Sequence, residues 1–243
     1  MTGGYLEWQV RARLVLPIIA FREYIFRDVL PHFDNLDQKS EDVGSKHYES
    51  LVSQPATEDF DGDLSSFAED AQDRALGWYE MMRSLRQTMI NLLAAGLFHL
   101  IEQQLCMLCR DAGFLVGPPK ETALREVAKW YKSNLRFDLQ RLPSWNLIDE
   151  LRLVANTVKH AEGRSSSELK VRRPELFCDP AFASMASVLT EVDDYYDKKI
   201  ISAPLAGDDL FVSGAILKMY AEGAEVFFGE IAEHFAAHED DSY

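Results

Sequence analysis

Apolar residues recur at helical spacing over a long proline-free stretch in the first half of the chain. From Ser66 to Asp111 they return every three or four residues, as they do on the faces of an α-helix. The apolar positions are Trp78, Met82, Leu85, Met89, Leu92, Leu93, Leu97, Leu100, Ile101, Leu105 and Leu108. We predict one long helix that ends before Gly113, with a break near Gly77 as the alternative. Such a helix is not stable alone, so it must pack against other elements.

The N-terminal residues show weaker patterns. Residues 5–33 read as helical, with Pro17 as a kink or as the first residue of a new helix. Apolar residues alternate from Trp8 to Leu16, so a short strand is the alternative there. Residues 34–66 are acidic and polar, and we predict one short helix near Ser45–Leu51.

The C-terminal half contains two more amphipathic patterns and one β-prone region. Thr122–Asn134 and Gly214–His238 both have apolar residues at helical spacing. Val188–Val192 and Asp209–Val212 are short β-prone runs that could pair as one small hairpin within residues 185–212. The predicted fold class is therefore all-α, with room for a single hairpin.

One segment combines a core-facing stripe with a polar one. Glu150–Gly163 reads as a helix that ends at the glycine, and Ser144 is a candidate N-cap for it. Arg152, Asn156 and His160 follow each other at intervals of four residues and therefore lie along one side. The opposite side is apolar: Ile148, Leu151, Ala155 and Val158. We expect a packed helix that presents Arg, Asn and His together.

These side-chain types suit acid–base chemistry at a phosphate. His160 can accept or donate a proton near neutral pH, and Asn156 could orient a phosphate or a ribose. Arg152 is the better source of positive charge, because a guanidinium binds phosphate through two hydrogen bonds, whereas Lys159 offers only a point charge. The alternative is that Asn156 and His160 only satisfy neighbouring polar groups.

Charge narrows the classes of partner. The 243-residue chain has a net charge of −15, which disfavours broad binding to nucleic acid or to anionic membranes. The charge is uneven, however, since Lys120–Arg173 carries +5 and the remainder −20. This window contains the polar stripe. It is either a small anion-binding face or a chance excess on a solvated surface.

The sequence gives no reason to expect a metal or a cofactor. Cys106 and Cys109 form a lone pair at CxxC spacing within an apolar helix and are better explained as core cysteines. His234 and His238 have metal-ligand spacing near the acidic C-terminal residues, where adventitious metal binding is the most we expect. Three cysteines, no signal-peptide pattern and no run of 18 apolar residues favour a reduced cytoplasmic protein without a membrane span.

Two further polar features lie near the candidate helix. Glu102 is surrounded by apolar residues and could bind a basic side chain of the Arg152–His160 stripe, although a solvent-facing carboxylate is the alternative. Arg172 and Arg173, followed by Pro174, could clamp a phosphate, but such a cluster is more often a solvated turn.

A resemblance to a known family rests on two segments. The apolar run Leu85–Cys106, followed at a distance by Glu150–His160, resembles HEPN-like helical domains, which are common in bacterial toxin–antitoxin and phage-defence systems. Many such domains dimerise and act as metal-independent ribonucleases through an arginine, a neighbouring asparagine and a histidine. Asn156 and His160 fit those positions, and Ala155 stands where the family has its arginine.

The resemblance covers roughly residues 70–180 and implies a HEPN-like helical bundle. We divide the chain into an N-terminal helical extension with an acidic loop, residues 1–65, and a HEPN-like domain with a C-terminal helix, residues 66–243. The first functional interpretation is a non-catalytic binding or dimerisation module. The alternative is a metal-independent ribonuclease that uses Asn156 and His160. Apolar residues surround most of the circumference of the long helix, and one domain does not cover them all, so we also predict a homodimer. RNA or another protein is the expected further partner.

Overall fold

The computed structural model describes residues 2–54, 64–112, 119, 123–161, 163–180 and 210–238. Within these residues the protein is all-α, without a β-strand. The helices are α1 (Gly3–Gln9), α2 (Leu16–Tyr24), α3 (Leu36–Val52), α4 (Ser65–Ala112), α5 (Leu124–Asn134), α6 (Trp145–His160), α7 (Arg164–Arg172) and α10 (Gly214–Ala237). Most of the hairpin that the sequence allows between residues 185 and 212 lies outside the described residues.

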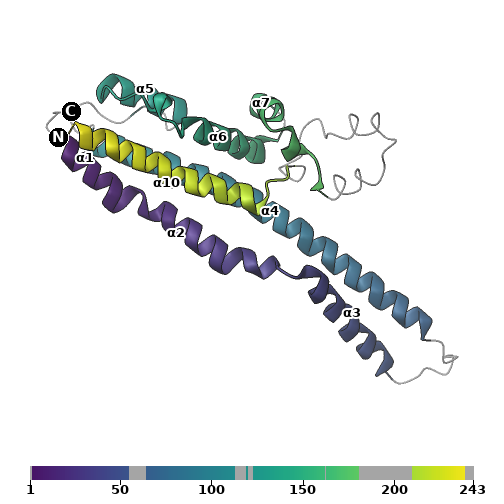
Figure 1. The fold of residues 1–243 in the computed structure, drawn as a ribbon. Helices are drawn as coiled ribbons and strands as arrows, with labels where there is room; N and C mark the ends of the chain where they lie inside the picture. The colour runs from purple at the N-terminus through teal and green to yellow at the C-terminus, as the bar shows by residue number, and fades with distance from the viewer. Residues whose placement is uncertain are drawn as a thin grey trace.

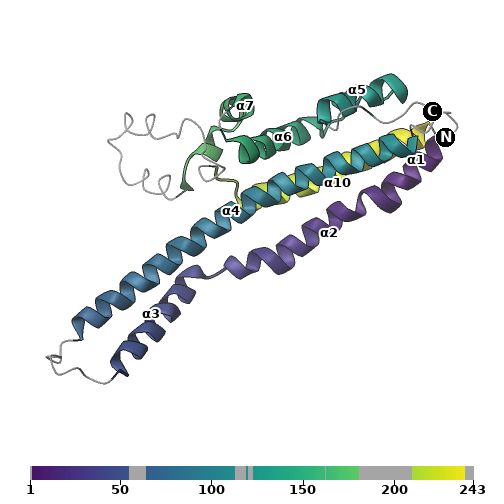
Figure 2. The same cartoon turned by 180° about the vertical axis from the view of Figure 1, so that it is seen from behind.

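α4 organises the molecule. It runs without interruption for 48 residues, so the break near Gly77 does not occur, and its length is about 72 Å at the rise of an α-helix. Its C-terminal half runs alongside α10 in the middle of a helical body, with α1 and α2 on one side and α5, α6 and α7 on the other (Figure 1). Its N-terminal half leaves the body and pairs with α3 as a two-helix arm, which the view from behind also shows (Figure 2).

The N-terminal residues are helical, and the strand alternative is wrong. π-helical turns at Val10–Leu14 and Ile25–Val29 interrupt the first helices, and Pro17 lies in the first turn of α2, as predicted. The alternation of apolar residues arises because two faces are apolar. Residues at four-residue steps are buried against the body, whereas Trp8 and Leu16 between them are exposed. The buried set is Leu6, Val10, Leu14 and Ile18.

One hydrophobic core connects elements from both ends of the chain. It includes Leu6 of α1, Ile101 of α4, Leu151 of α6 and Phe235 of α10. Gly3 lies so close to α10 that a Cβ atom there would be 2.2 Å from the carbonyl oxygen of His238. A domain boundary between residues 65 and 66 stays a prediction, and residues from both sides of it share this core.

The arm is held by close contact between small residues. A Cβ atom on Gly44 of α3 would lie 3.0 Å from the carbonyl oxygen of Ala71 and 3.1 Å from Cβ of Ala75 on α4. His47 Nε2 is 2.8 Å from Asp70 Oδ2 across the same pair of helices. The predicted helix near Ser45–Leu51 is therefore part of a longer one, α3.

α4 also contains a window that is long and apolar enough to cross a membrane, with a mean hydropathy of 1.5 over 18 residues. Half of this window is buried inside the protein. A core helix of a soluble protein has the same character, since its apolar face is covered by other helices rather than by lipid. The window therefore gives only weak support to a membrane span.

Candidate functional site

α6 presents its apolar stripe to the core, as the sequence predicts. Ile148, Leu151, Ala155 and Val158 are all buried. The predicted end of the helix is wrong, because α6 stops at His160 and Ala161 takes a positive φ of 52°. Gly163 is instead the N-cap of α7, and its N–H donates a hydrogen bond to Ser166 Oγ.

Ser144 stands at the N-cap position of α6, but its side chain does not cap the helix. Its hydroxyl donates to Glu230 Oε2 of α10 at 2.5 Å. The serine therefore ties the start of α6 to α10, which a search for capping residues could not reveal.

Arg152 is occupied by a carboxylate of its own helix. Its Nε donates to Asp149 Oδ1 at 2.8 Å, and Asp149 Oδ2 lies 3.0 Å from Arg172 Nη2 of α7. Only 12% of the Arg152 side chain is exposed. Burial raises the pKa of Asp149, but the hydrogen bond from Arg152 and the charges of both arginines lower it below its usual value. The guanidinium that the chemistry requires is thus already paired with a carboxylate through Nε, while its buried Nη2 has no hydrogen-bond partner among the described residues.

The other three candidate side chains lie nearer the C-terminal end of α6. Asn156 is half-buried, whereas Lys159 and His160 are exposed. None of the three forms a hydrogen bond or an ion pair with another residue in the described part of the chain. The helix therefore places Asn156 and His160 on one side, as expected, but Arg152 turns to Asp149 instead of joining them.

Glu102 of α4 lies against this part of α6. Burial raises the pKa of its carboxyl, while the charge of Lys159, the backbone N–H of Leu124 and the charges of His99 and Arg152 oppose the rise. The side chain is 18% exposed. The electrostatic coupling to Lys159 and Arg152 agrees with the expectation that Glu102 faces basic residues of α6. Among the described residues, the ion pair that Glu102 forms is with His99 of its own helix, at 3.9 Å.

We expect Glu102→Gln to stabilise the protein at neutral pH. Because the folded state raises the pKa of this carboxyl, the folded protein binds the proton more tightly than the unfolded chain. Its contribution to stability is therefore present below the unfolded pKa and is lost as pH rises through the folded pKa. Thermal unfolding of both proteins from pH 4 to 8 measures this. Equal melting temperatures across the range would contradict the raised pKa.

Arg172 and Arg173 lie where α7 ends, and Arg172 is exposed, which agrees with the interpretation as a solvated turn, but both side chains are also ion-paired. Arg172 contacts Glu168 at 2.7 Å in addition to Asp149. Arg173 Nη1 donates to Glu150 Oε1 and its Nε to Glu175 Oε1, both at 2.5 Å. With their donors used in this way, the two arginines do not form an open phosphate clamp.

The ion pairs of Arg173 with Glu150 and Glu175 are extended by a further residue, which the sequence analysis did not single out. The hydroxyl of Tyr220 on α10 donates to Glu150 Oε1 at 2.7 Å. Burial raises the pKa of Tyr220, so the hydroxyl keeps its proton and remains a donor. Glu150 therefore joins α6, α10 and the end of α7 through Tyr220 and Arg173.

The cysteine and histidine pairs form no metal centre in the described residues. Cys106 and Cys109 are free thiols whose pKa is raised by burial, which keeps them protonated. The ring of His234 stacks on Phe137 at a centroid distance of 3.7 Å, and His238 Nδ1 contacts the carbonyl oxygen of His234. The contacts of both pairs are therefore those of structural side chains and not those of metal ligands.

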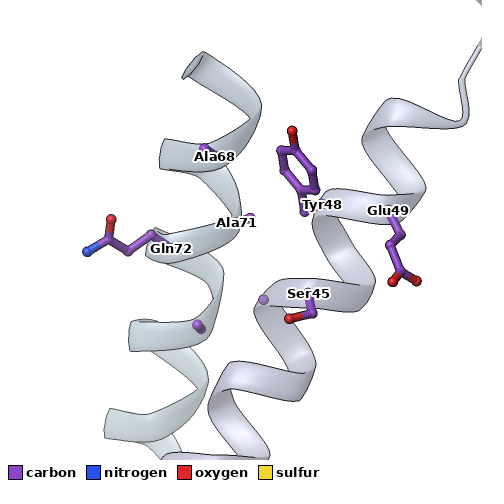
Figure 3. A pocket seen from close by; sticks show the side chains of 8 residues that line it. Ser45, Tyr48, Glu49, Ala68, Ala71 and Gln72 are labelled. Atoms are coloured by element: carbon purple, nitrogen blue, oxygen red, sulfur yellow. The ribbon is translucent and has the colours of Figure 1, made fainter. Parts of the chain in front are cut away.

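An open groove of about 520 Å³ lies between α3 and α4 in the arm (Figure 3). The arm is remote from α6 in the fold (Figure 1). Small residues of α4, including Ala68 and Ala71, line one side, and Ser45, Tyr48 and Glu49 of α3 line the other. None of the candidate catalytic residues lines it.

The chain matches no protein-family model, no curated protein and no solved structure.

Proposed function

We propose that this chain is a HEPN-like helical scaffold of a bacterial defence or stress system, located in the cytoplasm, which acts by binding and dimerising and does not cleave RNA. The observation that carries the proposal is the pairing of Arg152 with Asp149. RNA self-cleavage requires a base for the 2′-hydroxyl proton and a cation beside the phosphate. Here the only guanidinium on the polar stripe is mostly buried and already bonded to a carboxylate.

The neighbouring positions do not replace this cation. Ala155, where the resemblance would require arginine, is fully buried and faces the core. Lys159 is exposed but lies beside the carboxylate of Glu102 and cannot form a two-pronged contact. A scaffold needs no such cation, and its natural partners are a second copy or another protein.

The alternative is a metal-independent ribonuclease that uses Asn156 and His160. The exposure of Lys159 and His160 at the same end of α6 favours it, because a phosphate could reach both. This enzyme would need Arg152 to leave Asp149, or a cation from a second chain.

We expect purified protein to leave RNA intact, with or without EDTA. The assay incubates a labelled single-stranded RNA with wild type and with His160→Ala at equal concentration. Both should give the same background. Cleavage by wild type that survives EDTA and disappears in His160→Ala would establish the ribonuclease instead.

A matched pair of variants tests the role of the cation. If cleavage is observed, Arg152→Ala should reduce it more than Lys159→Ala does, because guanidinium suits a charged phosphate better. If the scaffold proposal holds, neither variant changes the RNA, and Arg152→Ala acts only on stability, by leaving Asp149 with Arg172 alone.

A further inference from the structure

The arm consists of α3 and the N-terminal half of α4. Both overall views show it projecting from the helical body (Figure 1, Figure 2), and among the described elements only α4 packs extensively on α3. Two helices bury only the sides that face each other, so each keeps sides that are open to water. The groove lies along one of these, where the ring of Tyr48 stands opposite Ala68 and Ala71 (Figure 3).

The groove has an apolar interior that continues past both of its ends. Its lining includes small residues from both helices: Gly44, Ala68, Ala71 and Ala75. Val52 follows Tyr48 by one turn of α3 on the groove side, and it is 45% exposed. Leu76 follows Gln72 by one turn of α4 at the other end, and it is 55% exposed. Covering these side chains would remove apolar surface from water.

We propose that this groove binds an amphipathic helix of a partner protein, one that carries lysine and arginine beside its apolar side. The inference rests on the partner-binding part of the proposed function, and it names the surface and the chemistry of the partner. It does not depend on whether the chain dimerises or cleaves RNA.

Carboxylates border the groove on both helices. Glu49 lines it, and Glu41 lies two turns earlier on the same side of α3. Glu69 lies one turn before Gln72 on α4. All three carboxylates are exposed, and none forms an ion pair in the described part of the chain. A helix in the groove therefore meets negative charge from both of its walls.

The basic residues of the arm lie away from the groove. At 100° per residue, Arg74 projects from the opposite side of α4, and Lys39 and Lys46 project from the side of α3 that faces away from α4. The contact of His47 with Asp70 also lies on the side opposite the groove. Lysine and arginine on the partner would thus find unpaired carboxylates, whereas acidic residues would meet like charge.

The whole arm region concentrates the negative charge of the protein. Residues 34–80 contain 13 Asp and Glu against 3 Lys and Arg, a net charge of −10 out of −15 for the chain. A field of this kind steers a cationic partner toward the region that produces it. The partner that the groove borders would hold is therefore also the one that the arm attracts from a distance.

A helix is the shape that suits the groove. The described part of the arm has no strand to which an extended segment could add. A third helix laid between α3 and α4 packs against both, as helices do in a bundle. From Glu41 to Val52 the groove side of α3 is about 17 Å long, so three turns of a partner helix would cover it.

We expect the protein to bind a fluorescent helical peptide of leucine and lysine, with leucine at every third or fourth position and about 18 residues in length. Fluorescence anisotropy at about 150 mM salt measures the affinity. Two control peptides have glutamate in place of lysine, or glutamine in place of leucine. Both should bind at least about 10-fold more weakly, because the first meets like charges and the second has no apolar side to bury.

Two pairs of variants locate the binding surface. Glu49→Lys and Ala68→Lys should each weaken binding of the leucine–lysine peptide at least about 10-fold, because each sets a positive charge at the groove. Glu23→Lys on α2 and Ser50→Lys on the other side of α3 make the same changes of net charge at exposed positions. These controls should bind within about twofold of wild type. Circular dichroism of all four variants should match wild type.

Loss of binding in the two groove variants with both controls unchanged supports the inference. Equal weakening in groove variants and controls means that the peptide responds only to net charge, which overturns it. Failure of the leucine–lysine peptide to bind, or equal binding of the glutamate peptide, overturns it as well. RNA cleavage by wild type would instead overturn the proposed function and leave the peptide result unaffected, so the two failures are distinguishable.

Discussion

Replacing Ala155 with arginine should destabilise the protein severely rather than create a nuclease. Ala155 is fully buried on the core side of α6. Arginine there overfills the packing and brings an unpaired charge out of water, for a cost of about 4 kcal/mol or more. In a chain of this length the melting temperature should fall by roughly 8–16 °C. Thermal unfolding followed by circular dichroism measures it.

Asn156→Arg is the control for this substitution. Position 156 is half-buried, so an arginine stem can lie along the surface while its guanidinium reaches water. We expect a change within about 1 kcal/mol. An Ala155→Arg protein that is as stable as wild type and cleaves RNA would contradict both the burial argument and the scaffold proposal.

The second large effect concerns Glu150. Glu150→Ala should destabilise the protein by about 3 kcal/mol, because it leaves the partly buried guanidinium of Arg173 without its inner partner and the hydroxyl of Tyr220 without an acceptor. Urea unfolding curves for wild type and variant give the difference in free energy of unfolding.

Two neighbouring variants rank the parts of this network. Glu175 contacts Arg173 from the exposed side, so Glu175→Ala should cost less than about 1 kcal/mol. Tyr220→Phe removes one hydrogen bond and should cost about 1 kcal/mol. If Glu175→Ala lowered the free energy of unfolding as much as Glu150→Ala, the exposed contact of Arg173 with Glu175 would be the main stabilising one, and not its contact with Glu150 of α6.

The helices that the sequence predicts best are those whose packing matches their own periodicity. α4, α5, α6 and α10 lie within a few residues of their predicted ranges, because each buries one apolar face of period 3.6. The helices α1 and α2 are harder to predict from the sequence, because their apolar residues line two faces and π-helical turns shift the period of the pattern. The small residues at Gly44, Ala71 and Ala75 mark the arm only once α3 and α4 are seen side by side (Figure 2).

In the candidate site, contacts within α6 follow from the sequence, whereas contacts between α6 and other helices do not. The core stripe of α6 follows from spacing alone, and so does the common side of Asn156 and His160. The pairing of Arg152 with Asp149 could also have been predicted, because side chains three residues apart are neighbours on a helix. The contact of Asp149 with Arg172 of α7 could not. Tyr220 reaches Glu150 across 70 residues of sequence. Such pairs depend on tertiary packing, which spacing within one segment cannot reveal.

Because α1 packs against α10, the core contacts between them can form only after nearly the whole chain has been synthesised. Leu6 of α1 and Val10 of the π-helical turn that follows it are buried in a core that includes α10, yet α10 begins about 210 residues later in the chain. At ordinary ribosomal speeds of about 5–20 residues per second, α1 waits roughly 10–40 s for this helix. During that interval its apolar side chains have no permanent cover, so the nascent chain should need a chaperone or a transient partner until α10 emerges.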